Sequence, residues 1–162
     1  MCQKTIKAIL FDHDGTLVDS EEVHYKLWAT ILSSYNITFF KKDYICHYAG
    51  VPTTSNAEMI VNTYSLQISP KVLIQEKCNL ISAYLSHNAF PLMPGVKKSL
   101  SYFKQLGVKM AVVTGAGIEG VNVTINNNDL KEFFSTIVSS DDVEYNKPAP
   151  DPYLLALKEL GH

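Results

Sequence analysis

The sequence predicts an α/β protein with a doubly wound parallel sheet and an inserted all-helical segment. Apolar runs typical of buried parallel strands occur at residues 4–12, 108–114 and 136–139. Helical patterns alternate with the last two runs, as in βαβ units. Between residues 18 and 90 only helical patterns occur. We therefore expect a core domain formed by residues 1–17 and 91–162, and a helical cap domain formed by residues 18–90.

Composition excludes several classes of function. The chain has 162 residues, is 46% hydrophobic and carries a net charge of −2. It has no basic block, so neither nucleic acid nor an anionic membrane is an expected partner. The apolar stretch at residues 6–11 is too short for a signal peptide or a membrane span. The three cysteines (Cys2, Cys46, Cys78) fit no metal-ligand spacing and predict reduced thiols of a cytoplasmic protein.

The elements of the first half follow from local patterns. The run at residues 4–12 ends in Asp-His-Asp-Gly, which predicts a strand that feeds a tight turn. Asp19 and Ser20 are expected to cap a helix that starts at Glu21. Further helices are predicted at residues 41–48, 55–64 and 69–85, the last with Ser69 as its cap and Pro70 as its first helical residue.

The second half alternates helices with strands. A helix over residues 96–106 is expected to stop at Gly107, before the strand at 108–114. The following helices are predicted at residues 118–126, 129–134 and 151–160, with the strand at 136–139 before the last of them.

Polar residues follow the predicted strands. Asp12 and Asp14 follow the first strand, Thr114 ends the second, and Lys147 follows the third after a loop. In open parallel sheets, ligands bind at the carboxyl ends of the strands. A carboxylate there can attack a phosphoryl group, and a second carboxylate can protonate the leaving oxygen. Gly15 allows the chain to turn sharply beside them.

Such a site needs positive charge. Two like charges about 4 Å apart cost roughly 4 kcal/mol at an effective dielectric near 20. Mg²⁺ suits a site of carboxylate and phosphate oxygens, and Lys147 adds a fixed charge. The Thr114 hydroxyl and the amides of Gly115 and Ala116 are expected to bind phosphate oxygens near a helix start.

Three motifs together resemble the haloacid dehalogenase superfamily. FDHDGTLVDS at residues 11–20 is similar to its nucleophile motif, VVTGA at 112–116 to its second motif, and NKPAPDPY at 146–153 to its third. The resemblance covers essentially the whole chain and implies a Rossmann-like core with a helical cap. It implies Asp12 as nucleophile and Asp14 as acid/base. Mg²⁺ would be held by the Asp12 carboxylate and the Asp14 backbone carbonyl.

Within the superfamily, the sequence looks closest to the sugar-phosphate phosphatase and β-phosphoglucomutase branch. That resemblance rests on His24 after the first motif, the cap pair Gly50-Val51, and a cap lysine matched by Lys77. A partly exposed helix position is the alternative for His24, and a solvated helix face is the alternative for Lys77. Mutases of this kind commonly have an arginine after the Gly-Val pair, whereas Pro52 and Thr53 follow it here. We therefore favour a Mg²⁺-dependent phosphatase of a small phosphate ester, with a mutase as the alternative.

Other polar residues leave two interpretations open. His13 occupies a position that is normally apolar in this family, so it either packs near the cap or tunes the pocket. Asp141 and Asp142 could be mistaken for metal ligands, but their place before Lys147 predicts a polar loop or helix cap.

The fourth family motif, an acidic pair on a further strand, is not found before His162. We expect this chain to be a truncated form of a longer phosphatase, which would be monomeric at full length. If the short form is natural, its exposed first strand predicts edge pairing between two chains or with a partner's strand. An inactive fragment or phosphate-binding module is a further alternative.

Overall fold

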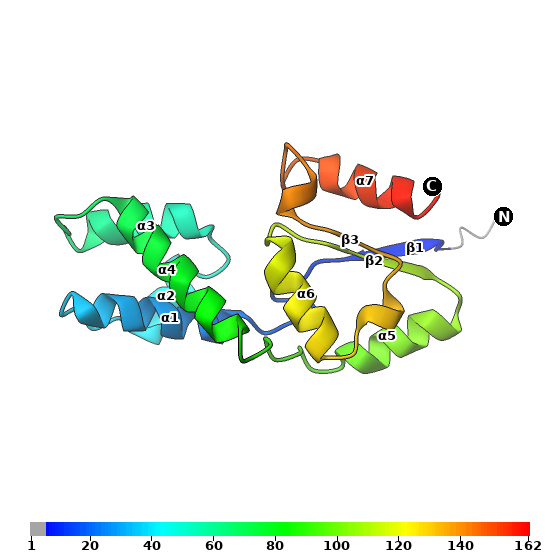
Figure 1. Ribbon diagram of the computed structural model, residues 1–162, viewed down its shortest axis with the longest axis horizontal. Coiled ribbons are helices and arrows are strands. Elements are labelled where there is room, and N and C mark those ends of the chain that lie inside the picture. Colours follow the sequence, from blue (N-terminus) through cyan, green and yellow to red (C-terminus); the bar gives the residue numbers. More distant parts are fainter. Residues whose placement is uncertain (1–5) are drawn as a thin grey trace. The chain divides into compact units, whose positions relative to one another are not determined.

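A computed structural model of the chain describes residues 6–162, so Cys2 and the start of the predicted first strand lie outside the described residues. The chain divides into two compact units (Figure 1). The core unit comprises Met1–Asp19 and Ala89–His162, and the cap unit comprises Ser20–Asn88. Each unit has its own apolar interior and is described separately below.

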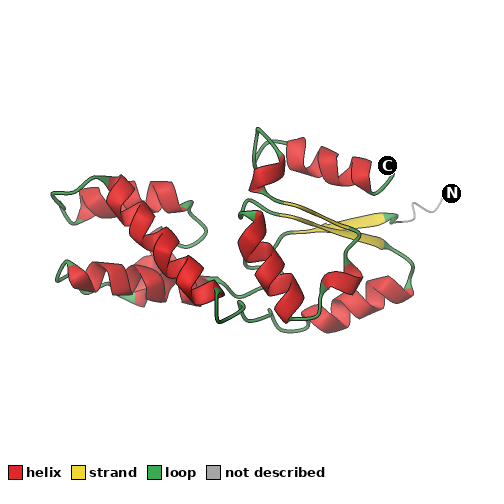
Figure 2. Ribbon diagram, viewed as in Figure 1, coloured by secondary structure: helices red, strands yellow, loops and turns green. Residues whose placement is uncertain are grey.

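The core unit contains the predicted parallel sheet (Figure 2). Its strands β1 (Ala8–Phe11), β2 (Lys109–Val113) and β3 (Thr136–Val138) lie in the order β1-β2-β3. The register pairs Phe11 with Val112 and Val113 with Val138. The three strands therefore end at the same edge of the sheet, where the residues that follow them come together.

Helices cover both faces of this sheet. Figure 1 shows α7 (Asp151–Glu159) over one face and α5 (Val96–Gln105) and α6 (Ile118–Asn127) over the other. Because successive side chains of a strand point to opposite faces, Ala111 and Val113 pack in one buried cluster with Ala156 of α7. This arrangement confirms the predicted doubly wound α/β fold.

Two short 3₁₀ turns follow α6. The first, η1 (Lys131–Phe133), occupies the stretch where residues 129–134 predict a short helix. The second, η2 (Ser140–Asp142), follows β3. Asp141 and Asp142 have the capping role that the sequence predicts. The Asp142 side chain accepts a hydrogen bond from Ser139 N in a capping box, and Asp141 Oδ2 accepts one from Ile118 N at 2.8 Å.

The cap unit is all helical between residues 20 and 88. Its helices are α1 (Glu21–Ser34), α2 (Lys41–His47), α3 (Thr53–Thr63) and α4 (Pro70–Leu85). Their apolar faces meet around Trp28, Leu32, Ile60 and Leu73, each at most 1% exposed. Burying four such side chains stabilises the unit by about 1.5–3 kcal/mol each.

Capping differs between α1 and α4. Ser69 caps α4 as expected, because its hydroxyl accepts from Lys71 N at 3.4 Å. Ser20 precedes α1 but makes no side-chain capping bond. Its backbone is already helical (φ −84°, ψ −19°), whereas a capping hydroxyl needs an extended backbone to reach the amides of the first turn.

Among residues 6–162, no helix combines the length and the apolar character that crossing a lipid bilayer requires.

Candidate active site

A tight turn presents Asp12 at the carboxyl end of β1. Gly15 has φ of 70°, a left-handed conformation that glycine adopts without strain. The carbonyl oxygen of His13 accepts hydrogen bonds from the amides of Thr16, Leu17 and Val18, at 3.3, 2.9 and 3.1 Å. The backbone that carries the two aspartates is therefore fixed by hydrogen bonds within the turn.

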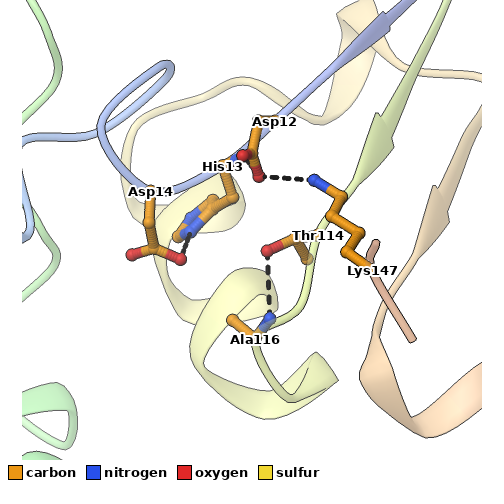
Figure 3. Close-up of polar contacts among 6 residues, drawn as sticks. All are labelled: Asp12, His13, Asp14, Thr114, Ala116 and Lys147. Atoms are coloured by element: carbon orange, nitrogen blue, oxygen red, sulfur yellow. Dashed lines mark hydrogen bonds and ion pairs between the residues drawn. The ribbon is translucent and has the colours of Figure 1, made fainter. Parts of the chain in front are cut away.

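Asp12 is paired with the predicted lysine. Lys147 Nζ lies 2.9 Å from Asp12 Oδ1, and the same oxygen accepts from His13 N at 2.8 Å (Figure 3). The Asp12 side chain is 48% exposed, whereas that of Lys147 is 21% exposed. Within residues 6–162 no hydrogen bond or ion pair engages Asp12 Oδ2. One carboxylate oxygen is thus held in place, and the other can approach a ligand.

Thr114 lies directly after β2 and is buried. Its hydroxyl accepts from Ala116 N at 3.0 Å, and Figure 3 shows this pair beside Asp12 and Lys147. The Ala116 amide must therefore exchange its bond with Thr114 before it can bind a phosphate oxygen. Gly115, between them, lies just before the N-terminus of α6, where the helix dipole favours an anion.

Asp14 lies on the side of Asp12 opposite Lys147 (Figure 3). Its side chain is 35% exposed, and its Oδ2 lies 3.3 Å from Nδ1 of His13 (Figure 3). His13 is only 1% exposed, so the residue between the two aspartates points inward while both carboxylates reach solvent.

The donor set fits a magnesium ion. Oxygen ligands suit Mg²⁺, which commonly uses one or two carboxylates and keeps waters and substrate phosphates as its other ligands. The Asp12 carboxylate oxygen described above is such a donor, and the carbonyl of Asp14 is two residues away. In the described part of the chain no three acidic, histidine or cysteine side chains converge as a metal cage.

In the cap unit, the structure brings His24 and Lys77 together. Lys77 is 3% exposed, and its Nζ lies 3.0 Å from His24 Nδ1 and 5.4 Å from the Trp28 ring centroid. The solvated helix face considered for Lys77 is therefore wrong. Burial lowers the pKa of Lys77 to about 7, although the negative charge of Glu21 partly opposes this shift.

The loop that contains Gly50 and Val51 is held by residues that the motifs did not single out. Glu21 accepts from Gly50 N at 3.2 Å and from the hydroxyl of Tyr44. Asn56 donates to the carbonyls of Tyr48 and Val51 at 3.0 and 3.1 Å. Of these residues, only Asn56 could have been identified from the sequence. It lies four positions before Ile60, so it places a polar side chain on the apolar face of a helix.

Burial and the Glu21 carboxylate both raise the pKa of the Tyr44 phenol. The phenol therefore stays protonated and donates to Glu21 throughout the physiological pH range.

Comparisons with known proteins show the family of the chain. Residues 9–162 match the family of haloacid dehalogenase-like hydrolases. The chain is 30% identical to a fructose-1-phosphate phosphatase of Escherichia coli over 154 residues, covering 95% of this chain and 80% of the relative. It is 28% identical to a phosphorylated carbohydrates phosphatase of Thermotoga maritima, covering 96% of this chain and 71% of the relative.

Solved structures share the fold. A putative β-phosphoglucomutase from Thermotoga maritima superimposes with a TM-score of 0.76 at 24% identity, over 96% of this chain and 71% of that one. A predicted phosphoglycolate phosphatase from Haemophilus somnus superimposes with a TM-score of 0.83 at 21% identity, over 98% of this chain and 73% of that one.

Proposed function

The chain belongs to the haloacid dehalogenase-like hydrolases, and we propose that it hydrolyses a small sugar-phosphate-like ester through a phosphoryl group carried by Asp12. The observation that carries this proposal is the pairing of Asp12 with Lys147, 2.9 Å apart, at the carboxyl end of β1 and beside Thr114. A nucleophile, a cation and a hydroxyl donor at one strand edge are what phosphoryl transfer to a carboxylate requires.

The residues divide the reaction between them. An oxygen of Asp12 attacks phosphorus, and the bond from phosphorus to the leaving oxygen breaks with its electron pair moving to that oxygen. Asp14 gives the leaving oxygen a proton. In the second step Asp14 takes a proton from water, whose oxygen attacks the phosphorus and releases inorganic phosphate and the Asp12 carboxylate. Lys147, Thr114 and the Gly115 amide bind the phosphoryl oxygens.

We assign the Asp12 carboxylate and the Asp14 carbonyl as the ligands of a Mg²⁺ ion. When bound, this ion neutralises the negative charge shared by the carboxylates and the phosphoryl group. Lys147 supplies part of the same compensation from the protein itself.

A sugar-phosphate-like substrate is supported by the names of the curated relatives, a fructose-1-phosphate phosphatase and a phosphorylated carbohydrates phosphatase. In the cap unit, we assign contacts with the substrate to His24, Lys77 and the Gly50-Val51 loop. The free thiols of Cys46 and Cys78 support a reducing, cytoplasmic location.

The test is phosphate release by the purified chain from fructose 1-phosphate, glucose 1-phosphate and p-nitrophenyl phosphate, with and without Mg²⁺. Asp12→Asn keeps the size of the side chain and removes the nucleophile. We expect Mg²⁺-dependent release that this variant lowers by at least about 10³-fold.

Two results would contradict the proposal. One is phosphate release that Asp12→Asn leaves intact. The other is conversion of glucose 1-phosphate to an isomeric sugar phosphate without net release, which would identify a mutase instead.

A further inference from the structure

His13 is a buried polar residue at the centre of the site. It is 1% exposed, and its ring packs edge-on against Phe90 with centroids 6.3 Å apart. Its ring nitrogen Nδ1 lies 3.3 Å from Asp14 Oδ2, and its backbone amide donates to Asp12 Oδ1. One residue thus contacts both carboxylates, the nucleophile through its main chain and the acid through its side chain (Figure 3).

Packing alone does not explain a histidine at this position. Its other ring nitrogen, Nε2, is buried and has no hydrogen-bond partner within residues 6–162. An unsatisfied buried polar atom costs about 1–3 kcal/mol, and an apolar side chain of similar size would fill the space without that cost. The contact with Asp14 is the interaction that offsets this cost.

The tautomer follows from the same surroundings. With its proton on Nδ1, the imidazole donates to Asp14 Oδ2 and leaves a lone pair at Nε2. The opposite tautomer would direct a lone pair at the carboxylate and bury an N–H group that finds no acceptor. The donating tautomer therefore fits the site.

We propose that His13 is a positioning residue that holds Oδ2 of Asp14, so that Oδ1 faces the leaving group of the phosphate ester. This inference rests on the proposed phosphatase function and on the role of Asp14 as its acid. Proton transfer in the transition state requires Asp14 to lie within hydrogen-bond reach of the leaving oxygen. A carboxylate tethered at one oxygen loses the rotational freedom that would carry it out of reach.

Substrates that differ in their need for an acid provide the test. An alkyl phosphate releases a strongly basic alkoxide, which needs a proton as it leaves, whereas p-nitrophenyl phosphate releases a weakly basic anion that does not. The value of kcat/KM reports the steps up to departure of the leaving group. It should therefore be measured for both substrates in the wild type, His13→Leu and His13→Asn.

We expect His13→Leu to lower kcat/KM for the alkyl phosphate about 10–100-fold, and to change it less than about threefold for p-nitrophenyl phosphate. His13→Asn keeps an amide near the position of Nδ1, and should restore part of the alkyl activity. Phe90→Leu alters the packing around the ring and keeps the imidazole, so it is the matched control and should leave the ratio of the two values unchanged.

If His13→Leu lowers kcat/KM equally for both substrates, or lowers it for neither, the ratio is unchanged and the positioning role is overturned. If His13→Leu does not fold, His13→Gln takes its place, because its longer side chain moves the amide away from the Nδ1 position. A lower ratio of kcat/KM for the alkyl phosphate to that for p-nitrophenyl phosphate then supports the positioning role, and an unchanged ratio overturns it. Failure of the proposed function gives a different result, since the wild type itself would then release no phosphate from either ester.

Discussion

At the scale of single residues, the Asp12–Lys147 pair places a fixed positive charge beside the Asp12 carboxylate. The ammonium group of Lys147 lies 2.9 Å from Asp12 Oδ1 and 5.6 Å from the centroid of the Tyr153 ring. Both contacts hold the lysine side chain in one place before substrate arrives. A preorganised cation of this kind costs little reorganisation during phosphoryl transfer.

Replacing this lysine tests its contribution. Lys147→Met should lower kcat/KM for phosphate release about 100-fold or more, because a fixed positive charge no longer faces the phosphoryl oxygens. Lys147→Arg should keep part of the activity. Lys158→Met removes the same charge from an exposed position on α7 and is the control. Equal activities of Lys147→Met and Lys158→Met would refute the role.

Lys77 couples the stability of the protein to pH. Burial lowers its pKa from 10.5 to about 7 in the folded state. Between these values the unfolded chain binds a proton that the folded chain does not. The free energy of unfolding of the wild type, relative to that of Lys77→Met, should therefore rise with pH by at most about 1.4 kcal/mol per unit, between about pH 7 and 10.

Urea denaturation in reducing buffer at several pH values in this window measures that difference. Lys71→Met, at an exposed position of the same helix, should show no such slope. A difference between the wild type and Lys77→Met that stays constant with pH would show that Lys77 is protonated in the folded protein.

The sequence predicts those parts of the site that follow from the sheet topology, but not those that depend on side-chain packing. The placement of Asp12, Thr114 and Lys147 was predictable, because parallel strands end at one edge of a sheet. The burial of Lys77 was not, because it depends on the packing of α4 against α1. The bond from Ala116 to Thr114 was also unpredictable, since it depends on a side-chain rotamer.

At the scale of elements, the start of α1 organises the loop between α2 and α3. The Glu21 carboxylate accepts from Tyr44 in α2 and from Gly50 in the loop. Gly50 has φ of 72°, which a residue with a side chain rarely adopts. Asn56 holds the far end of the loop from α3. The loop is therefore fixed by contacts from three helices.

Removing the Tyr44 hydroxyl should loosen this loop. A hydrogen bond to a charged group contributes about 1.5–3 kcal/mol, and about 1.4 kcal/mol corresponds to a tenfold change in affinity. If loosening of the loop carries part of this energy into substrate binding, Tyr44→Phe should raise KM for the preferred sugar phosphate about 5–10-fold. The kinetics with p-nitrophenyl phosphate should change less than twofold. Tyr25→Phe removes a hydroxyl that donates to Phe39 in the same unit and is the control. Equal effects on both substrates would contradict a role of the loop in selectivity.

Helix boundaries show where sequence reasoning was sufficient at this scale. Ser69 and Pro70 predicted the start of α4, because capping depends on adjacent residues. Glu21 was predicted only as the first residue of a helix. Its bonds to Tyr44 and Gly50 join residues 23 and 29 positions apart, which no local pattern reveals.

At the scale of the whole molecule, the two units have separate interiors. The single tryptophan, Trp28, lies in the apolar cluster of the cap unit. In the core unit, Leu100 of α5 is fully buried. Tryptophan fluorescence therefore reports on the cap unit alone, and we expect the two units to respond separately to substitutions in their interiors.

Two matched cavities test this independence. Leu73→Ala in the cap unit should cost about 2–5 kcal/mol and shift the fluorescence-detected urea transition to lower concentration. Leu100→Ala should leave that transition in place and destabilise the core unit, as measured by hydrogen exchange of β2 amides. A fluorescence transition that Leu100→Ala moves as far as Leu73→Ala does would show that the units unfold as one.

The proposed mechanism requires a phosphoryl group bound covalently to Asp12. The most direct test is to quench the enzyme with acid during turnover of its best phosphate ester with Mg²⁺, and to analyse its peptides by mass spectrometry. We expect one phosphoryl group on the peptide that contains Asp12, lost on treatment with hydroxylamine and absent from Asp12→Asn. A phosphoryl group on another residue, or turnover by Asp12→Asn, would contradict this mechanism.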